Sequence, residues 1–172
     1  MMSFFELNHE MDEILDNLYL GGIEAAENVD KLKELGIKKV LSLLDCFWPE
    51  YKESDNITHK KISICDVYIE NIIKYFGECL NFIKGDDKIL VHCAAGASRS
   101  ATIVIAFLMW DKKMSYKQAL DFARSKRSII WPNKGFEDQL KLFEKELIDK
   151  NYDIDKIKFE EIKWEPKINN PF

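Results

Sequence analysis

The sequence predicts an α/β fold, with a small and mostly parallel central sheet flanked by helices. Short apolar runs of strand length come early in the chain of 172 residues and alternate with stretches of helical spacing. One fully apolar strand, at 89–91, leads through a loop of small residues into an apolar helix. Strands that are separated by helices usually return in the same direction, so we expect most of the sheet to be parallel.

The first half of the chain supplies most of the short strands. Residues 18–20 are apolar and end at a Gly-Gly pair, which predicts a strand followed by a turn. Residues 28–35 have helical spacing, and Gly36 suits the C-cap of that helix. Residues 39–44 form an apolar run typical of a buried strand, and 62–64 are a further strand candidate.

The second half supplies most of the helices. Apolar residues at spacings of three and four predict a helix over 69–83. After the strand at 89–91, residues 98–110 are apolar on nearly every side and are predicted to form the central buried helix. Ser115 and Asn133 are good N-cap residues, and each precedes a further amphipathic helix.

Composition and charge exclude several classes of partner. Apolar residues make up 47% and charged residues 32% of the chain, which suits a globular protein with a core. The net charge of −5 argues against nucleic acid or an anionic membrane as the main partner, because both attract positive charge. We see neither an apolar leader nor an apolar run of the ~20 residues that span a bilayer. We therefore expect a cytoplasmic or nuclear protein.

The sequence also predicts the domain organisation and argues against a metal site. Residues 1–150 are assigned to one globular domain and 151–172 to a charged tail of undetermined role. The four cysteines form no CxxC pair and the three histidines are scattered, so we expect no metal site. No pattern in the sequence determines the oligomeric state.

Residues 92–100, His-Cys-Ala-Ala-Gly-Ala-Ser-Arg-Ser, form the loop between the strand at 89–91 and the buried helix. At such a junction the loop amides and the helix N-terminus point into one concavity, which binds a tetrahedral anion. Arg99 adds a planar guanidinium that suits two phosphate oxygens. The predicted phosphate-binding residues are therefore Ala94, Ala95, Gly96, Ala97, Ser98 and Arg99.

Cys93 lies at the start of this loop and is the candidate nucleophile. The amides, the helix dipole and Arg99 would stabilise its thiolate at neutral pH, as they would stabilise phosphate. Ser100 can donate its hydroxyl to the departing sulfur when the intermediate is hydrolysed.

The run HCAAGASRSA resembles the Cys-x5-Arg signature of the cysteine-dependent phosphatases, and its SRSA ending is similar to the dual-specificity protein phosphatases. The blocks NLYLGG, LGIKKVLSL and RSIIWPNKGFEDQL also resemble that family, so the resemblance covers about residues 15–147. It implies a small, single-domain, metal-independent member that needs no cofactor and has a cysteine-dependent phosphatase-like fold. This enzyme would hydrolyse phosphotyrosine, phosphoserine and phosphothreonine of a protein substrate, such as a kinase, through a phosphocysteine intermediate.

The resemblance also implies an aspartate that acts as general acid and then as general base. In the family it lies on a loop before the helix that precedes the signature strand, and Asp66 fills that place. Asp45 is the runner-up. Asp86 and Asp87 look too close to the start of the strand to reach the site.

Other polar residues are expected to support the loop. His92 is expected to hold it by hydrogen bonds rather than to transfer protons. Asn133 is expected to cap its helix and, by the resemblance, to steady the phosphate loop. Arg127 belongs to a small basic cluster that we interpret as a solvated face, with contact to a second substrate phosphate as the alternative. The remaining cysteines are expected in the core, with a protective disulfide to Cys93 as an alternative.

Two other functions stay open. One is a phosphatase for a non-protein phosphate, such as a phosphoinositide or an RNA 5′-phosphate. Lipid-directed relatives tend to place lysines in the loop where this chain has Ala94, Ala95 and Ala97, which argues against that alternative. The other is a non-catalytic phosphate-binding module. The presence of Cys93 and Arg99 argues against it, because such modules typically lack the nucleophile.

Overall fold

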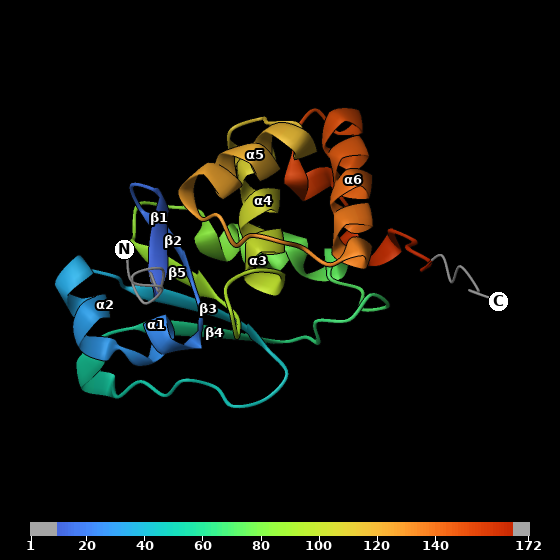
Figure 1. The fold of residues 1–172 in the computed structure, drawn as a ribbon. Coiled ribbons are helices and arrows are strands. Elements are labelled where there is room, and N and C mark those ends of the chain that lie inside the picture. The colour runs from blue at the N-terminus through green and yellow to red at the C-terminus, as the bar shows by residue number, and fades with distance from the viewer. Residues whose placement is uncertain (1–9, 167–172) are drawn as a thin grey trace, which may run out of the picture.

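The computed structural model describes residues 10–166, which form a five-stranded sheet covered by helices on both faces (Figure 1). The strand order is β1-β2-β5-β3-β4, and β1 alone pairs antiparallel with its neighbour. This arrangement confirms the predicted small, mostly parallel sheet. The strands are β1 (Met11–Leu15), β2 (Leu18–Gly21), β3 (Lys39–Leu44), β4 (Thr58–Ser63) and β5 (Ile89–His92).

The two faces of the sheet bury different sets of helices. Successive strand residues point to opposite faces. Leu41 and Leu43 accordingly pack with the larger helical layer, and Val40 packs on the opposite face. The smaller layer holds α1 (Ile23–Glu27) and α2 (Val29–Leu35); the larger holds α3 (Phe76–Ile83), α4 (Arg99–Asp111), α5 (Tyr116–Lys126) and α6 (Lys134–Asp149).

Helix α4 is the central buried helix that the sequence predicts. All its residues from Arg99 to Met109 are buried, because β2, β3, β5 and the other helices of the larger layer surround it. The predicted caps are also confirmed. Ser115 accepts a hydrogen bond from the Gln118 amide to begin α5, and Asn133 accepts one from the Phe136 amide to begin α6.

The predicted helix over 69–83 is wrong in its first part. Helical structure begins with a 3₁₀ turn at Ile73–Tyr75 and continues as α3, while Ile69 stays 64% exposed. Tertiary hydrogen bonds explain the difference, because they satisfy the backbone of the preceding segment in a loop. Gln139 Nε2 donates to the Glu70 carbonyl, and Gln139 Oε1 accepts from the Ile73 amide.

Strands β1 and β4 differ from the sequence prediction for a related reason. Strand β4 begins at Thr58 rather than at Ile62, because it pairs with β3 over the full length of that strand. Strand β1 is acidic and lacks a strand pattern, yet it forms as the antiparallel partner of β2. Helix α1 is a further element that the sequence prediction missed.

The described part of the C-terminal tail, 151–166, is packed on the domain. Two 3₁₀ turns, at Ile154–Lys156 and Phe159–Glu161, carry it along the larger helical layer. The apolar side chains of Ile154, Ile157 and Phe159 are buried there and join the main core cluster. The hydrophobic core therefore extends beyond α6 and includes side chains of the tail.

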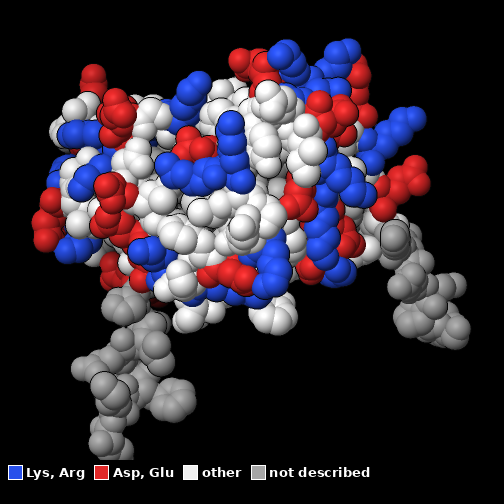
Figure 2. Space-filling model, turned by 90° about the horizontal axis from the view of Figure 1, so that it is seen from above, with Lys and Arg blue, Asp and Glu red and all other residues white. Residues whose placement is uncertain are grey.

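The surface carries mixed charge. Figure 2 shows acidic and basic side chains interspersed over one face of the molecule, without a broad basic field. That distribution agrees with the net charge of −5. Between residues 10 and 166, no helix combines the length and the hydropathy that a membrane-crossing segment needs.

Candidate active site

The loop between β5 and α4 holds the Cys93 sulfur at its base. The thiol is 2% exposed, and two donors reach its Sγ: the Gly96 amide at 3.3 Å and the Ser100 hydroxyl at 3.1 Å. Gly96 has a positive φ of 67°, and a Cβ there would collide with the Gly21 carbonyl. A residue without a side chain is thus required where the loop turns over the sulfur.

The carbonyls of Ala94, Ala95, Gly96 and Ala97 are all bound by donors from outside the loop. The Ile23 amide donates to the Ala94 carbonyl at 3.0 Å, and the Trp131 amide donates to the Ala97 carbonyl at 2.7 Å. Arg127 donates to both carbonyls in between, Ala95 and Gly96. Because these carbonyls turn outward, the amides of the same loop are left to line its inner side. Such a nest of amides binds anions.

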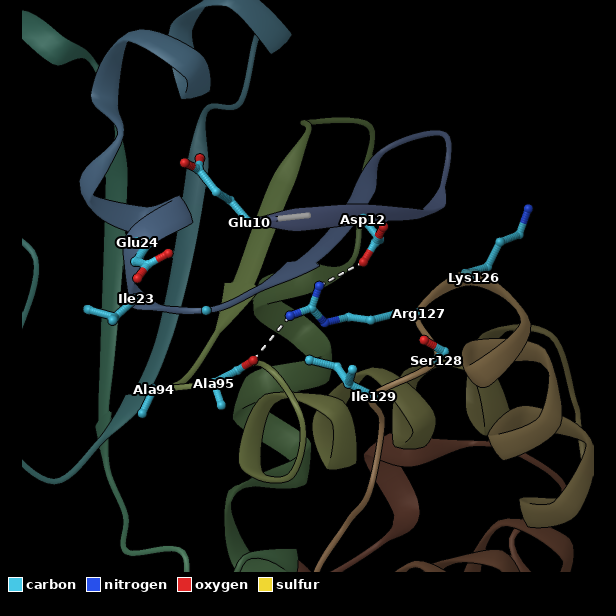
Figure 3. Close-up of a pocket in the computed structure, with 11 residues that line it drawn as sticks. Glu10, Asp12, Ile23, Glu24, Ala94, Ala95, Lys126, Arg127, Ser128 and Ile129 are labelled. Atoms are coloured by element: carbon cyan, nitrogen blue, oxygen red, sulfur yellow. Dashed lines mark hydrogen bonds and ion pairs between the residues drawn. The ribbon is translucent and has the colours of Figure 1, made fainter. Parts of the chain in front are cut away.

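Arg127 is a clamp on this loop and not part of a solvated face, so that interpretation of the basic cluster is wrong for Arg127. Its side chain is 6% exposed, and Figure 3 shows the guanidinium between Asp12 and Ala95. Nε donates to Gly96 O at 3.0 Å, Nη2 to Ala95 O at 3.1 Å and Nη1 to the Asp12 carboxylate at 2.7 Å. The alternative, contact of Arg127 with a second substrate phosphate, stays a prediction.

A cavity of about 550 Å³ adjoins the outer side of the loop at Arg127. The carboxylates of Glu10, Asp12 and Glu24 lie in its wall, and the Lys126 side chain points away from the other residues in Figure 3. The residues around this cavity therefore carry mixed charge rather than positive charge alone.

Arg99 enters the site from the first turn of α4 and is buried. Its Nη1 donates to Asp45 Oδ1 and to the Ile64 carbonyl, both at 3.2 Å. Its Nε is buried and has no acceptor among the residues that the structure describes. A buried guanidinium N–H without a partner is unfavourable unless a ligand supplies an acceptor. This donor, together with the loop amides, is suited to an oxyanion.

Asp66 lies against the end of the phosphate loop. Its Oδ1 accepts hydrogen bonds from Ser98 Oγ and from Asn133 Nδ2, each at 2.8 Å, and the Asn133 amide donates to Ser98 Oγ at 3.1 Å. Asn133 therefore steadies the loop, as expected, and ties the aspartate to it.

Two other candidate aspartates, Asp45 and Asp87, form ion pairs with basic side chains. The Asp45 carboxylate is about half exposed and is ion-paired with Arg99 at 3.2 Å. The Asp87 carboxylate lies 3.8 Å from the Lys39 ammonium, at the end of β3 opposite Asp45. This geometry favours Asp66 over Asp45 as the acid, since Asp45 already orients Arg99.

His92 supports the loop from below, as expected. Its Nδ1 donates to the Cys93 carbonyl, so its Nε2 accepts from the Ser42 hydroxyl, which in turn accepts from His59 Nε2. Burial lowers the pKa of His92 to about 4, and burial lowers that of His59 to about 4. Both rings are neutral at pH 7, as this chain of hydrogen bonds requires.

Acid is therefore expected to destabilise the protein through His92. The unfolded chain binds a proton near pH 6.5 and the folded chain only near pH 4, so stability is complete above 6.5 and falls as the pH is lowered. Between pH 7 and 5 the loss from this group is about 2 kcal/mol. Urea unfolding at the two pH values measures it. His92→Gln should lose less stability between pH 7 and 5. An equal loss in the variant would show that His92 is not the source of the acid destabilisation.

The remaining cysteines are reduced, and only one lies in the core. Cys79 is buried, and burial raises the pKa of its thiol, whereas Cys46 and Cys65 are exposed, so the core prediction is wrong for those two. The protective disulfide to Cys93 stays a prediction. No group of three or more His, Cys, Asp or Glu within residues 10–166 is arranged to hold a metal ion.

Comparisons with known proteins identify the family of this chain. Residues 18–146 match the family model for the dual specificity phosphatase catalytic domain. Dual specificity protein phosphatase 1B of Arabidopsis thaliana is 37% identical over 142 residues, which are 80% of this chain and 84% of that protein. MAP kinase phosphatase with leucine-rich repeats protein 1 of Dictyostelium discoideum is 42% identical over 139 residues, which are 79% of this chain but 16% of that protein.

Solved structures agree with these matches. The human tyrosine phosphatase-like serine/threonine/tyrosine-interacting protein has a TM-score of 0.77 and 32% identity, covering 82% of this chain and 99% of that one. DUSP15 has a TM-score of 0.74 and 34% identity, covering 78% of this chain and 86% of that one.

Proposed function

The chain belongs to the dual specificity phosphatase family, and from that premise we propose how the site at the end of β5 hydrolyses phosphorylated proteins. The protein is a dual-specificity protein phosphatase. Its residue roles, its substrate and its location in the cell are the parts that we propose.

The phosphate is bound first, by the inward amides of residues 94–98 and by the free Nε of Arg99. The Cys93 sulfur then attacks phosphorus opposite the leaving oxygen. An S–P bond forms, the P–O bond of the substrate breaks, and Asp66 gives its proton to the departing hydroxyl oxygen.

The second step returns the enzyme to its starting state. Asp66, now ionised, takes a proton from water while the water oxygen attacks phosphorus. The P–S bond breaks and inorganic phosphate is released. The Ser100 hydroxyl, 3.1 Å from Sγ, donates to the sulfur as it regains its negative charge.

One observation carries this proposal above the others. A buried thiol, a buried Arg99 Nε without an acceptor and outward-bound carbonyls at residues 94–97 occur together in one loop and the first turn of the helix after it. The buried Arg99 N–H without a partner would be costly without an anion to accept its hydrogen bond. Together these features suit a phosphate ester within reach of a nucleophile.

The surroundings of the site support a protein segment as substrate. Phe47 follows the Asp45 loop and is 88% exposed; Val67 is next to Asp66; and Trp131, whose amide holds Ala97, is 73% exposed. Such apolar side chains suit residues on either side of a phosphorylated side chain rather than a polyphosphate. The name of the Dictyostelium relative supports a phosphorylated kinase as the first substrate to test.

Phosphate release from matched substrates tests the proposal. Peptides carrying phosphotyrosine, phosphoserine or phosphothreonine should be hydrolysed, and vanadate should inhibit because it mimics pentacoordinate phosphorus. A phosphoinositide and a 5′-phosphorylated RNA should be hydrolysed at least about tenfold more slowly, since the loop offers one guanidinium and no lysine. Faster turnover of either would replace the proposed substrate class, and phosphopeptide binding without turnover would support the non-catalytic module.

Location and partners complete the proposal. We place the protein in the cytoplasm or the nucleus, without nucleic acid as a partner. The absence of a cysteine framework in the sequence and the net charge of −5 support this placement. Residues 1–150 form the proposed phosphatase domain, and 151–172 form the tail.

A further inference from the structure

The loop that carries Asp66 is contacted by the C-terminal tail. The Trp164 and Tyr68 rings meet edge to face, with centroids 6.2 Å apart and an interplanar angle of 66°. Tyr68 is two residues beyond Asp66 in the same loop. The tail therefore touches the segment that positions the proposed general acid.

The Tyr68 backbone also packs closely against the start of α6. It approaches Gly135, in the first turn of α6, so closely that a Cβ on Gly135 would collide with the Tyr68 carbonyl. Asn133, two residues earlier, holds the Asp66 carboxylate. The start of α6 and the tail thus contact the same short stretch of loop.

The tail reaches Trp164 from a firm anchor. The Phe159 ring is buried against Phe143, with centroids 5.9 Å apart, and lies over Gly77 in a notch that a Cβ would fill. The Trp110 indole donates to the Tyr152 carbonyl at 3.1 Å. The tail is packed on the domain from Tyr152 to Phe159. Trp164 therefore follows a segment whose position is set by the core.

We propose that Trp164 is a positioning residue for Asp66, acting through Tyr68. Its ring favours the loop arrangement in which the Asp66 carboxyl meets Ser98 and Asn133. The inference rests on the proposed role of Asp66 and adds to the site a residue beyond 146, where the family match ends. An aromatic pair of this kind shifts such a loop equilibrium by about 2- to 10-fold.

Leaving-group dependence separates positioning of an acid from general destabilisation. The phenolate of p-nitrophenyl phosphate departs with little protonation, whereas that of phenyl phosphate needs the acid. Trp164→Ala should lower kcat/KM about 2- to 10-fold on phenyl phosphate and leave p-nitrophenyl phosphate nearly unchanged. Trp164→Phe should restore the rate, and Lys163→Ala, at the neighbouring exposed position, should match the unaltered protein.

A double variant tests whether the effect passes through Asp66. In an Asp66→Asn background, Trp164→Ala should cause no further loss on phenyl phosphate. Additive losses would overturn the inference, as would an equal loss on both substrates in Trp164→Ala alone. If the alanine variant does not fold, Trp164→Leu keeps much of the apolar contact and should show the same selective loss.

The single variant Asp66→Asn distinguishes failure of this inference from failure of the proposed function. If Asp66→Asn alone loses no more on phenyl phosphate than on p-nitrophenyl phosphate, Asp66 is not the acid, and both the assignment and the inference fail. If Asp66→Asn is selective and Trp164→Ala is not, only the role of Trp164 fails.

Discussion

Replacing Cys93 by serine is expected to abolish turnover while phosphate binding persists. Serine differs by one atom, and its oxygen can accept the hydrogen bonds that the Gly96 amide and the Ser100 hydroxyl now direct to the sulfur. The loop and Arg99 should therefore keep their arrangement. A serine hydroxyl is far less acidic than a thiol and stays protonated among the same donors, so no effective nucleophile remains.

The expected loss in kcat is at least about 10⁴-fold, as for other removed nucleophiles. Single-turnover release of p-nitrophenol measures it, and titration with inorganic phosphate measures the retained binding. Cys46→Ser is the matched control, because this thiol is exposed and lies outside the proposed chemistry. Turnover by Cys93→Ser within tenfold of the unaltered protein would refute Cys93 as the nucleophile.

Asp66→Asn is expected to have the second largest effect, about 10²- to 10⁴-fold on substrates with poor leaving groups. The asparagine oxygen can still accept from Ser98 or Asn133, so the loop should stay in place while the proton donor is lost. Phosphoserine peptides should suffer most, because an alkoxide leaves poorly without protonation. The measurement is kcat/KM over a series of aryl phosphates and peptides.

Asp45→Asn provides the contrast. This carboxylate pairs with Arg99, so its loss should weaken phosphate binding and slow all substrates to a similar degree. A leaving-group-dependent loss in Asp45→Asn, with Asp66→Asn unaffected, would exchange the two assignments.

Local signals were sufficient for several elements of the fold. Strand β3 has the predicted bounds Lys39–Leu44, and the caps at Gly36, Ser115 and Asn133 begin or end helices as their chemistry suggests. These features depend on residues that are near each other in the chain. The same is true of the phosphate loop, whose strand–loop–helix context lies within residues 89–111.

The sequence by itself therefore determined the α/β class, the anion-binding loop and the family to which its Cys-x5-Arg run points. Tertiary structure alone decided how the supporting residues are used. Asp12 pairs with Arg127 across 115 positions, Asp45 pairs with Arg99 across 54, and Trp164 reaches Tyr68 from the tail. No spacing in the chain encodes such contacts, because a side chain acquires a distant partner only when the packing of the core brings both segments together.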